Sequence, residues 1–151
     1  MNERQKATSD YLNQSYYLNE EIDSKIEHLN LLDDQLNKLT TIFKDTPPSS
    51  TRKVDSLQNT IANIMDLRVE INEKIDKFVD LQREIMHVIN KVTNSQYRTL
   101  LTNRYLIFDK WEMIAIKMNY SIQYIYDLHN KSLYEVEKII AKTRVNMKKS
   151  E

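Results

Sequence analysis

Residues 123–131 carry amide, carboxylate and ammonium side chains at the spacing of one helix face. The amides of Gln123 and Asn130 can each form two hydrogen bonds with adenine, at N6 and N7, and Lys131 can reach guanine or a phosphate. The carboxylate of Asp127 can accept a hydrogen bond from cytosine N4, although phosphates would repel it. These residue types predict a surface that contacts base pairs through Gln123, Tyr126, Asp127, Asn130 and Lys131.

Cations and one hydroxyl near this stretch predict contacts with phosphates, which position a protein on DNA without reading its sequence. The expected contacts come from Arg98, Arg104, Lys110, Lys117 and Ser121. A solvated helix face is the alternative for each lysine. Residues 1–95 contain 12 Lys+Arg against 16 Asp+Glu, a balance of −4, and residues 96–151 contain 10 against 6, a balance of +4. This asymmetry is expected if only the C-terminal third meets nucleic acid.

Two helices joined by a turn must position these side chains. Asp109 and Glu112 have the spacing of a capping box, which predicts a helix that begins at Lys110. The residues expected on its apolar side are Met113, Ile114, Ala115 and Met118.

Asn119 stands where this helix must stop. An abrupt stop needs a residue in the left-handed conformation, and asparagine adopts it at small cost in a chain that has no glycine. Ser121 then predicts the N-cap of a second helix, which would bury Ile125, Leu128 and Ser132 and expose the polar face described above. A helix, a short turn and a capped helix are typical of a helix-turn-helix.

Trp111 and His129 lie in the same stretch, and we interpret both as parts of its core. Trp111 is expected to anchor the helix entry, and His129 to be packed and hydrogen-bonded. The other histidines, His28 and His87, lie in separate segments, and the sequence has neither cysteine nor a glycine-rich loop. The sequence therefore predicts no catalytic residue, no metal site and no cofactor.

The first two thirds of the chain follow heptad patterns. Between Tyr11 and Phe43, eight of ten positions spaced alternately by four and three are apolar, and the next stretch, from Val54 to Val92, has ten of twelve. The second set includes Ile61, Arg68 and Ile75. Residues 45–51, with Pro47-Pro48, interrupt the pattern and predict a loop. The sequence thus predicts a long antiparallel helical hairpin, or coiled coil; a plain amphipathic helix on a globular core is the alternative for the first arm.

Further apolar residues widen the stripe of the second arm and predict pairing with another copy, with a dimer favoured. The alternative is that the C-terminal domain folds back over this flank. The residues expected to support self-association are Leu29, Leu36, Ile61, Ile71, Ile75 and Phe78.

The composition favours an all-α protein, because zero glycine and two prolines suit long uninterrupted helices. No apolar run approaches the ~20 residues of a membrane span, and the first ten residues lack a signal peptide's apolar region. Zero cysteine fits a reducing compartment. We therefore expect a cytoplasmic protein without membrane contact.

The C-terminal third, about residues 96–140, resembles region 4 of bacterial sigma factors and their phage-encoded relatives, the RinA-like and autolysin-regulator-like transcriptional regulators. The matching pairs and signatures are Arg104-Tyr105, Glu112 through Ile114-Ala115, Tyr120-Ser121, Leu128-His129 and Ser132-Leu133. In that family the position of Asp127 is often basic. The resemblance implies a helix-turn-helix in a three-helix domain, double-stranded DNA as a partner, RNA polymerase as a further one, and a bacterial host.

These patterns predict two domains: residues 1–93 as a helical hairpin for oligomerisation and residues 94–151 as a DNA-binding domain. The predicted function is a phage or prophage transcriptional regulator that binds promoter DNA. One alternative is a coiled-coil adaptor that docks RNA polymerase or another regulator. Another is the small subunit of a phage terminase, which also joins a helix-turn-helix to a helical oligomerisation segment.

Overall fold

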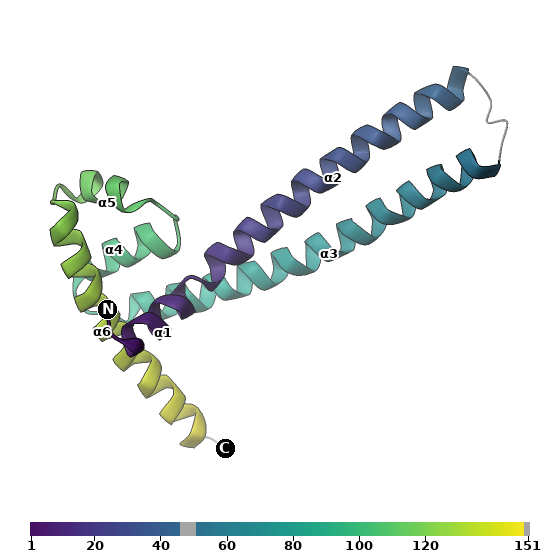
Figure 1. Ribbon diagram of the computed structural model, residues 1–151. Coiled ribbons are helices and arrows are strands. Elements are labelled where there is room, and N and C mark those ends of the chain that lie inside the picture. The colour runs from purple at the N-terminus through teal and green to yellow at the C-terminus, as the bar shows by residue number, and fades with distance from the viewer. Residues whose placement is uncertain (46–50, 150–151) are drawn as a thin grey trace. The chain divides into compact units, whose positions relative to one another are not determined.

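The computed structural model describes residues 1–45 and 51–149, and every regular element in those ranges is an α-helix (Figure 1). The all-α prediction is therefore confirmed. The predicted loop at Pro47-Pro48 lies outside the described residues. No helix within those ranges has the length and apolar character to cross a bilayer. The helices are α1 (Glu3–Leu12), α2 (Gln14–Asp45), α3 (Thr51–Asn90), α4 (Ser95–Tyr105), α5 (Trp111–Met118) and α6 (Ile122–Lys149).

The chain divides into two compact units. Unit 1 comprises Met1–Tyr17 and Val79–Glu151, and unit 2 comprises Leu18–Phe78. The packing thus groups the first helix and the end of α3 with the C-terminal helices, whereas the sequence predicted a division between residues 93 and 94. Contacts of α1 with α6, described below, account for this difference.

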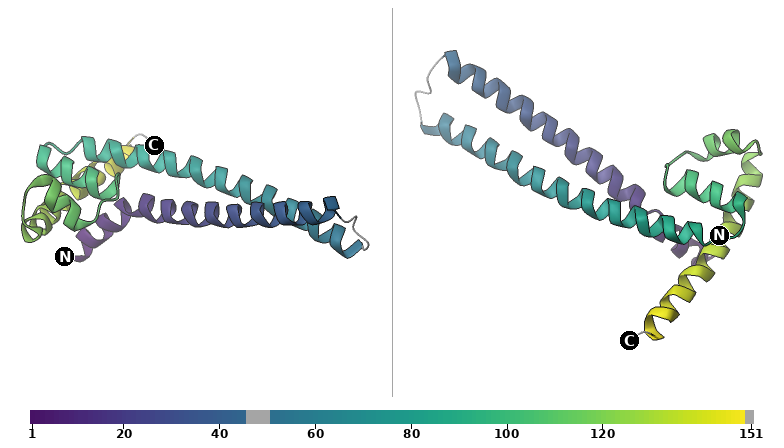
Figure 2. Two further views of the ribbon diagram at one scale, coloured as in Figure 1. Left: turned by 90° about the horizontal axis from the view of Figure 1, so that it is seen from above. Right: turned by 180° about the vertical axis from the view of Figure 1, so that it is seen from behind.

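Unit 2 consists of stretches of α2 and α3 that run side by side (Figures 1 and 2). Two ion pairs link them, from Glu21 to Lys74 and from Lys25 to Glu70, each with 2.9 Å between nitrogen and oxygen. The partner's number falls along α3 as the residue number rises along α2, so the two helices are antiparallel. Lys25, which interrupts the predicted seam, keeps its ammonium group at the edge through this pair.

The seam predicted for α2 agrees with the burial pattern. All ten predicted positions are buried or half-buried, including the self-association candidates Leu29 and Leu36. The helix is not continuous from Tyr11, however, because α1 ends at Leu12 and α2 begins at Gln14.

The seam predicted for α3 is wrong at three of its twelve positions. Ile61, Arg68 and Ile75 are exposed, and Leu67 is buried where the prediction placed Arg68. The Arg68 guanidinium lies 3.7 Å from the carboxylate of Asp33, at the edge of the helix pair. The second arm is apolar at two adjacent sets of heptad positions, and packing selects the set that leaves the guanidinium in water, because burying an unpaired charge is costly.

In unit 1, α1 packs against α6 and begins with a capping box that the sequence analysis did not predict. The Gln5 backbone N–H donates to Asn2 Oδ1 (2.8 Å), and the Asn2 N–H donates to Gln5 Oε1 (3.1 Å). Leu12 at the other end of α1 is fully buried in a cluster with residues of α3, α4 and α6. The N-terminal helix therefore belongs to the C-terminal core.

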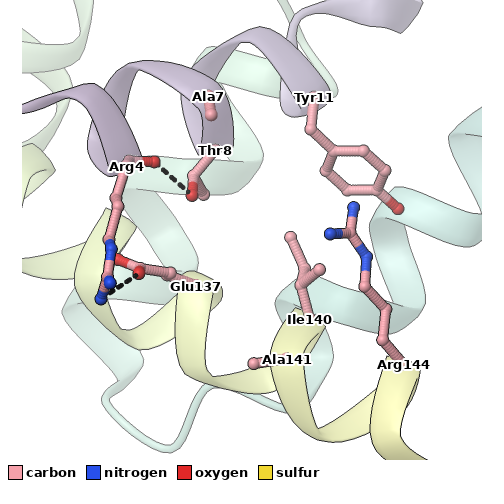
Figure 3. A pocket seen from close by; sticks show the side chains of 8 residues that line it. All are labelled: Arg4, Ala7, Thr8, Tyr11, Glu137, Ile140, Ala141 and Arg144. Carbon is pink, nitrogen blue, oxygen red and sulfur yellow. Dashed lines mark hydrogen bonds and ion pairs between the residues drawn. The ribbon is translucent and has the colours of Figure 1, made fainter.

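A cavity of about 280 Å³ lies between α1 and α6 (Figure 3). Arg4 and Glu137 form an ion pair of 3.8 Å at one side of it. Tyr11 and Arg144 point toward each other at the other side, and the Tyr11 hydroxyl donates a 2.6 Å hydrogen bond to Glu84 of α3. Burial and this carboxylate raise the pKa of the Tyr11 phenol above its usual value. Polar contacts therefore close the edges of the apolar α1–α6 packing.

Candidate nucleic-acid interface

The turn between α5 and α6 is built around Asn119. Its backbone is left-handed, with φ 59° and ψ 46°. The N–H of Tyr120 donates to the carbonyl of Ala115 (3.1 Å), and the N–H of Asn119 donates to that of Ile116 (3.2 Å). This hydrogen-bond pair is the Schellman motif, which ends a helix and turns the chain at once. The predicted left-handed stop is confirmed.

Ser121 caps the start of α6, as predicted. Its hydroxyl oxygen accepts a hydrogen bond from the backbone N–H of Tyr124 (3.2 Å). Ile125, Leu128 and Ser132 are buried, so the inward face of α6 also agrees with the prediction. The Ser121 hydroxyl thus accepts a hydrogen bond at the helix start, and its contact with a phosphate stays a prediction.

The start of α5 differs from the prediction. The helix begins at Trp111 with Lys110 as N-cap, and no side chain caps it. Asp109 does not form the expected capping box with Glu112; its carboxylate accepts instead from the Lys117 ammonium at 2.6 Å. The positive φ of 68° at Phe108, just before it, changes the direction of the chain. A charge-assisted contact with Lys117 outweighs a cap because it pairs two ionised groups.

The apolar face of α5 is narrower than predicted. Ile114 and Ala115 are buried in a cluster with Leu100 of α4 and residues of α6. Met113, however, is exposed, and Ile116 is 74% exposed. Helical spacing alone predicted that Met113 faces inward. In this eight-residue helix, however, only a narrow row of side chains, including Ile114 and Ala115, is buried against the neighbouring helices.

Helix α4 packs against α5 and α6 and contacts the turn between them. Its N-cap is Asn94, whose side chain accepts from the N–H groups of Gln96 (2.9 Å) and Tyr97 (3.2 Å). The Gln96 amide donates to the Tyr120 hydroxyl at 2.6 Å. The turn is therefore fixed from outside as well as by its own backbone.

The predicted base-contacting residues fall into two groups. Gln123, Asp127 and Lys131 are exposed and spaced by four, so they form one stripe along the first turns of α6. Tyr126 is partly exposed, but its ring lies edge-on against Trp111, with centroids 5.6 Å apart. Asn130 is half-buried, and its backbone carbonyl accepts from the Gln5 side chain (3.2 Å).

Tyr124 and Tyr134 flank this stripe and are exposed, a feature that the list of predicted contacts omits. Tyr124 lies against Tyr120, with ring centroids 4.6 Å apart. Helical spacing places Tyr134 on the same face as residues 123, 127, 130 and 131, and places Tyr124 at the edge of that face beside Lys131.

Three of the four cations expected to contact phosphates have internal partners. Arg98 donates to the carbonyls of Val92 (2.7 Å) and Thr93 (2.9 Å), in the segment between α3 and α4. Lys117 pairs with Asp109, as described above. Lys110 is exposed.

Arg104 is the third of these cations. Its guanidinium donates to the Asp109 carbonyl (3.0 Å) and lies 4.3 Å from the centre of the Trp111 ring. This arrangement holds the segment that leads into α5 against α4. Arg98, Arg104 and Lys117 therefore each form a contact within the protein. Their contact with phosphates stays a prediction.

His129 is buried and hydrogen-bonded, as predicted. Its Nε2 lies 2.6 Å from the Tyr105 hydroxyl, and its ring lies 4.6 Å from that of Trp111. Burial lowers the pKa of His129 to about 4, and the charge of Arg104 acts in the same direction. Trp111 is half-buried in this aromatic group and packs against the α4–α6 cluster, which fits the predicted anchor.

Comparisons of the chain with protein-family models, with curated proteins and with solved structures give no match. Among the described residues, no group of histidine and acidic side chains has a metal-binding arrangement. The functional assignment therefore depends on the chemistry of the α5–α6 surface.

Proposed function

We propose that this protein binds double-stranded DNA with α5, the Asn119 turn and α6 as a helix-turn-helix, and that it regulates transcription in a phage or prophage. The observation that supports this most directly is the exposed stripe of Gln123, Asp127 and Lys131 at the start of α6, immediately after a rigid, capped turn. In helix-turn-helix proteins the residues near the start of the second helix contact base edges in the major groove.

The stripe offers one donor–acceptor group, one acceptor and one cation. The Gln123 amide suits adenine, the Asp127 carboxylate suits cytosine N4, and the Lys131 ammonium suits guanine O6 and N7. Three such contacts at successive turns would read about three neighbouring base pairs in one groove. The DNA sequence that a single copy recognises should therefore be short.

The electrostatic contribution to binding should be small. In residues 95–137, all of which the structure describes, Lys110 and Lys131 are exposed cations that form no ion pair with a described residue, and the negative charge of Asp127 opposes them. Additional cations lie on the last turns of α6, at Lys142, Lys148 and Lys149. Because each neutralised phosphate contributes a slope of about −0.9 to the plot of log affinity against log salt, a single copy should show a slope of roughly −2 to −4.

The test is selection from a random duplex library with the purified chain, followed by fluorescence anisotropy on the enriched sequence and on a scrambled one. We expect preferential binding of the enriched duplex at ~50 mM salt and weaker binding at ~200 mM. The double variant Gln123→Ala/Lys131→Ala should lose the preference, while Lys38→Ala, an exposed position on α2, should keep it. No enrichment and no retention of any duplex at ~50 mM salt would reject DNA binding.

A protein-interaction adaptor is the second candidate, and one observation favours it. Met113, Ile116, Tyr120 and Tyr124 are exposed apolar or aromatic side chains on α5, the turn and α6. DNA phosphates would gain little from such groups, whereas protein interfaces are enriched in tyrosine and methionine. Ile116→Ala removes apolar surface without adding charge, so it should weaken co-elution with RNA polymerase and change DNA affinity little if this second function holds.

A further inference from the structure

We propose that a cavity lined by residues of α4, α5 and α6 binds a small organic anion, specifically an aromatic carboxylate. The cavity has a volume of about 400 Å³. Its lining includes Ser9 of α1 and polar and aromatic side chains of the other three helices: Arg104, Trp111, Tyr126, His129 and Asn130. All of these residues belong to unit 1. This ligand site does not depend on DNA binding.

The cavity has the size and composition of a small-molecule site. Such pockets usually enclose roughly 300–1,000 Å³ and combine an apolar or aromatic wall with a few polar groups that orient the ligand. Here the rings of Trp111 and Tyr126 supply the wall, with centroids 5.6 Å apart. Tyr126 is 39% exposed and Trp111 is half-buried, so both rings keep surface that a ligand can cover. A flat ring would gain contact area against them.

The charge of the lining selects an anion. Arg104 contributes a guanidinium, and no aspartate or glutamate of the described residues lines the cavity. Grouped aromatic rings can hold a cation, but this guanidinium lies 4.3 Å from the centre of the Trp111 ring and would repel one. Among the described residues, only Asp109 accepts a hydrogen bond from the guanidinium, through Nη1. The N–H groups of Nε and Nη2 are therefore left for an oxyanion.

His129 offers a second donor. Its Nε2 lies 2.6 Å from the Tyr105 hydroxyl, whereas its Nδ1 has no hydrogen-bond partner in the described part of the chain. Every fully buried side-chain nitrogen or oxygen of the described residues has such a partner, so Nδ1 is not sealed from solvent. The ring is otherwise buried, and this cavity is a space that it lines. We therefore assign Nδ1 to the ligand.

A carboxylate at Nδ1 would complete the hydrogen-bond chain that joins α1, α4 and α6. The anion requires a proton on Nδ1, which leaves Nε2 as the acceptor for the Tyr105 hydroxyl. The Tyr105 oxygen then accepts from the hydroxyl of Ser9, 3.0 Å away. Each contact in the chain has one donor and one acceptor, and the imidazole stays neutral.

Asn130 adds an amide to the same cavity. Its side chain is half-buried and forms no hydrogen bond with a described residue, since only its backbone carbonyl accepts from Gln5. The amide nitrogen can donate to a carboxylate oxygen. The guanidinium of Arg104, the imidazole of His129 and this amide therefore offer donors for both oxygens of a carboxylate, beside an aromatic wall for the rest of the molecule.

Trp111 makes the site directly measurable, because it is the only tryptophan of the chain and its ring is part of the lining. The experiment is a titration of the full chain with benzoate, without DNA and at constant ionic strength, followed by Trp111 fluorescence. A ligand of this size binds a fitting pocket with a Kd of about 1 mM, so we expect a saturable change between ~0.1 and ~20 mM. Benzamide, which has the same ring without the charge, should bind about tenfold more weakly or worse.

The variant Asn130→Asp places a carboxylate in the cavity, where it repels the probe and competes for Arg104. It should raise the Kd for benzoate by about tenfold or more. The matched control is Asn146→Asp, the same change at an exposed position about 24 Å farther along α6. It should bind benzoate like the parent. Circular dichroism should show the parent's helix content in both variants.

Three results would overturn the proposal. The first is a fluorescence change that rises linearly with benzoate and never saturates, which is collisional quenching. The second is equal binding of benzoate and benzamide, and the third is a Kd that Asn130→Asp leaves unchanged. Because DNA is absent, none of these results bears on the proposed function.

Discussion

The phenol oxygen of Tyr105 lies 2.6 Å from Nε2 of His129, inside the contact between α4 and α6. The hydroxyl of Ser9, from α1, lies 3.0 Å from the same phenol oxygen. Three helices thus meet at one hydrogen-bond chain. Burial raises the pKa of Tyr105 to about 12 and lowers that of His129 to about 4, so both groups are neutral at pH 7. A neutral imidazole that carries its proton on Nδ1 accepts the phenol's hydrogen bond at Nε2, and one that carries it on Nε2 donates to the phenol oxygen.

This histidine should make the fold sensitive to acid. The unfolded chain binds a proton at His129 below a pKa of ~6.5, whereas the folded chain binds it only near 4. The free energy of unfolding is therefore unaffected by His129 above pH 6.5 and decreases as the pH falls toward 4. Between pH 7 and pH 5 the free energy of unfolding should decrease by about 2 kcal/mol. Urea unfolding at both pH values measures it.

The comparison variant is His129→Phe, which keeps a ring in the core but cannot titrate. Its free energy of unfolding should be lower than the parent's at pH 7, because the Tyr105 hydroxyl loses one of its two hydrogen-bond partners and keeps only Ser9. The change between pH 7 and pH 5 should be smaller than in the parent by about the same 2 kcal/mol. An equal change in both proteins would show that other groups cause the acid sensitivity.

Arg104 should affect stability more than DNA affinity. Replacing it with alanine removes the contact with the Trp111 ring and the hydrogen bond to the Asp109 carbonyl, and should lower the free energy of unfolding by about 1 to 2 kcal/mol. Arg104→Lys should not restore it, since an ammonium cannot both stack and donate in the same plane. Anisotropy with the folded variants is the second measurement: a large loss of affinity without a loss of stability would make Arg104 a phosphate contact instead.

Asn119 should tolerate glycine and resist alanine. Its left-handed backbone costs a residue with a Cβ atom roughly 1 kcal/mol, and asparagine bears the conformation better than alanine does. Asn119→Ala should therefore lower the melting temperature, whereas Asn119→Gly should change it little or raise it. Thermal unfolding by circular dichroism compares the two. A Gly variant less stable than the Ala variant would contradict the role of the left-handed turn.

Local signals in the sequence predicted the turn and the start of α6 because Asn119 and Ser121 act within a few residues of themselves. The Asn94 cap was predictable for the same reason. Asp109 was not, since its choice between capping α5 and pairing with Lys117 depends on the fold of the segment around Phe108. The spacing of a capping box shows that a cap is possible, but it does not show whether another side chain, here Lys117, binds the capping carboxylate instead.

Long-range packing was harder to predict. The heptad pattern of α2 has one apolar face and gave the correct seam, but α3 has two, and the sequence did not show which one α2 would cover. The docking of α1 depends on Leu12 and Ser9, two residues in a polar segment whose role appears only when α4 and α6 are in place. The internal contacts of Arg98 and Arg104 escaped prediction because a basic residue looks the same whether it binds a carbonyl or a phosphate.

Asp127 is the residue whose replacement best separates base reading from general attraction to DNA. It is exposed between Gln123 and Lys131, so changing it should leave the fold intact. Asp127→Asn removes a negative charge near the phosphates while keeping the shape, and should raise affinity for scrambled duplex several-fold at ~50 mM salt. If the carboxylate accepts from cytosine N4, the same change should lower the preference for the selected duplex by about 1 to 3 kcal/mol, because an amide can turn its donor toward the base. Anisotropy with the selected duplex and with its C·G-to-T·A variant measures both effects. Unchanged affinity for every duplex would place Asp127 outside the groove and turn the DNA-facing side of α6 toward Tyr124.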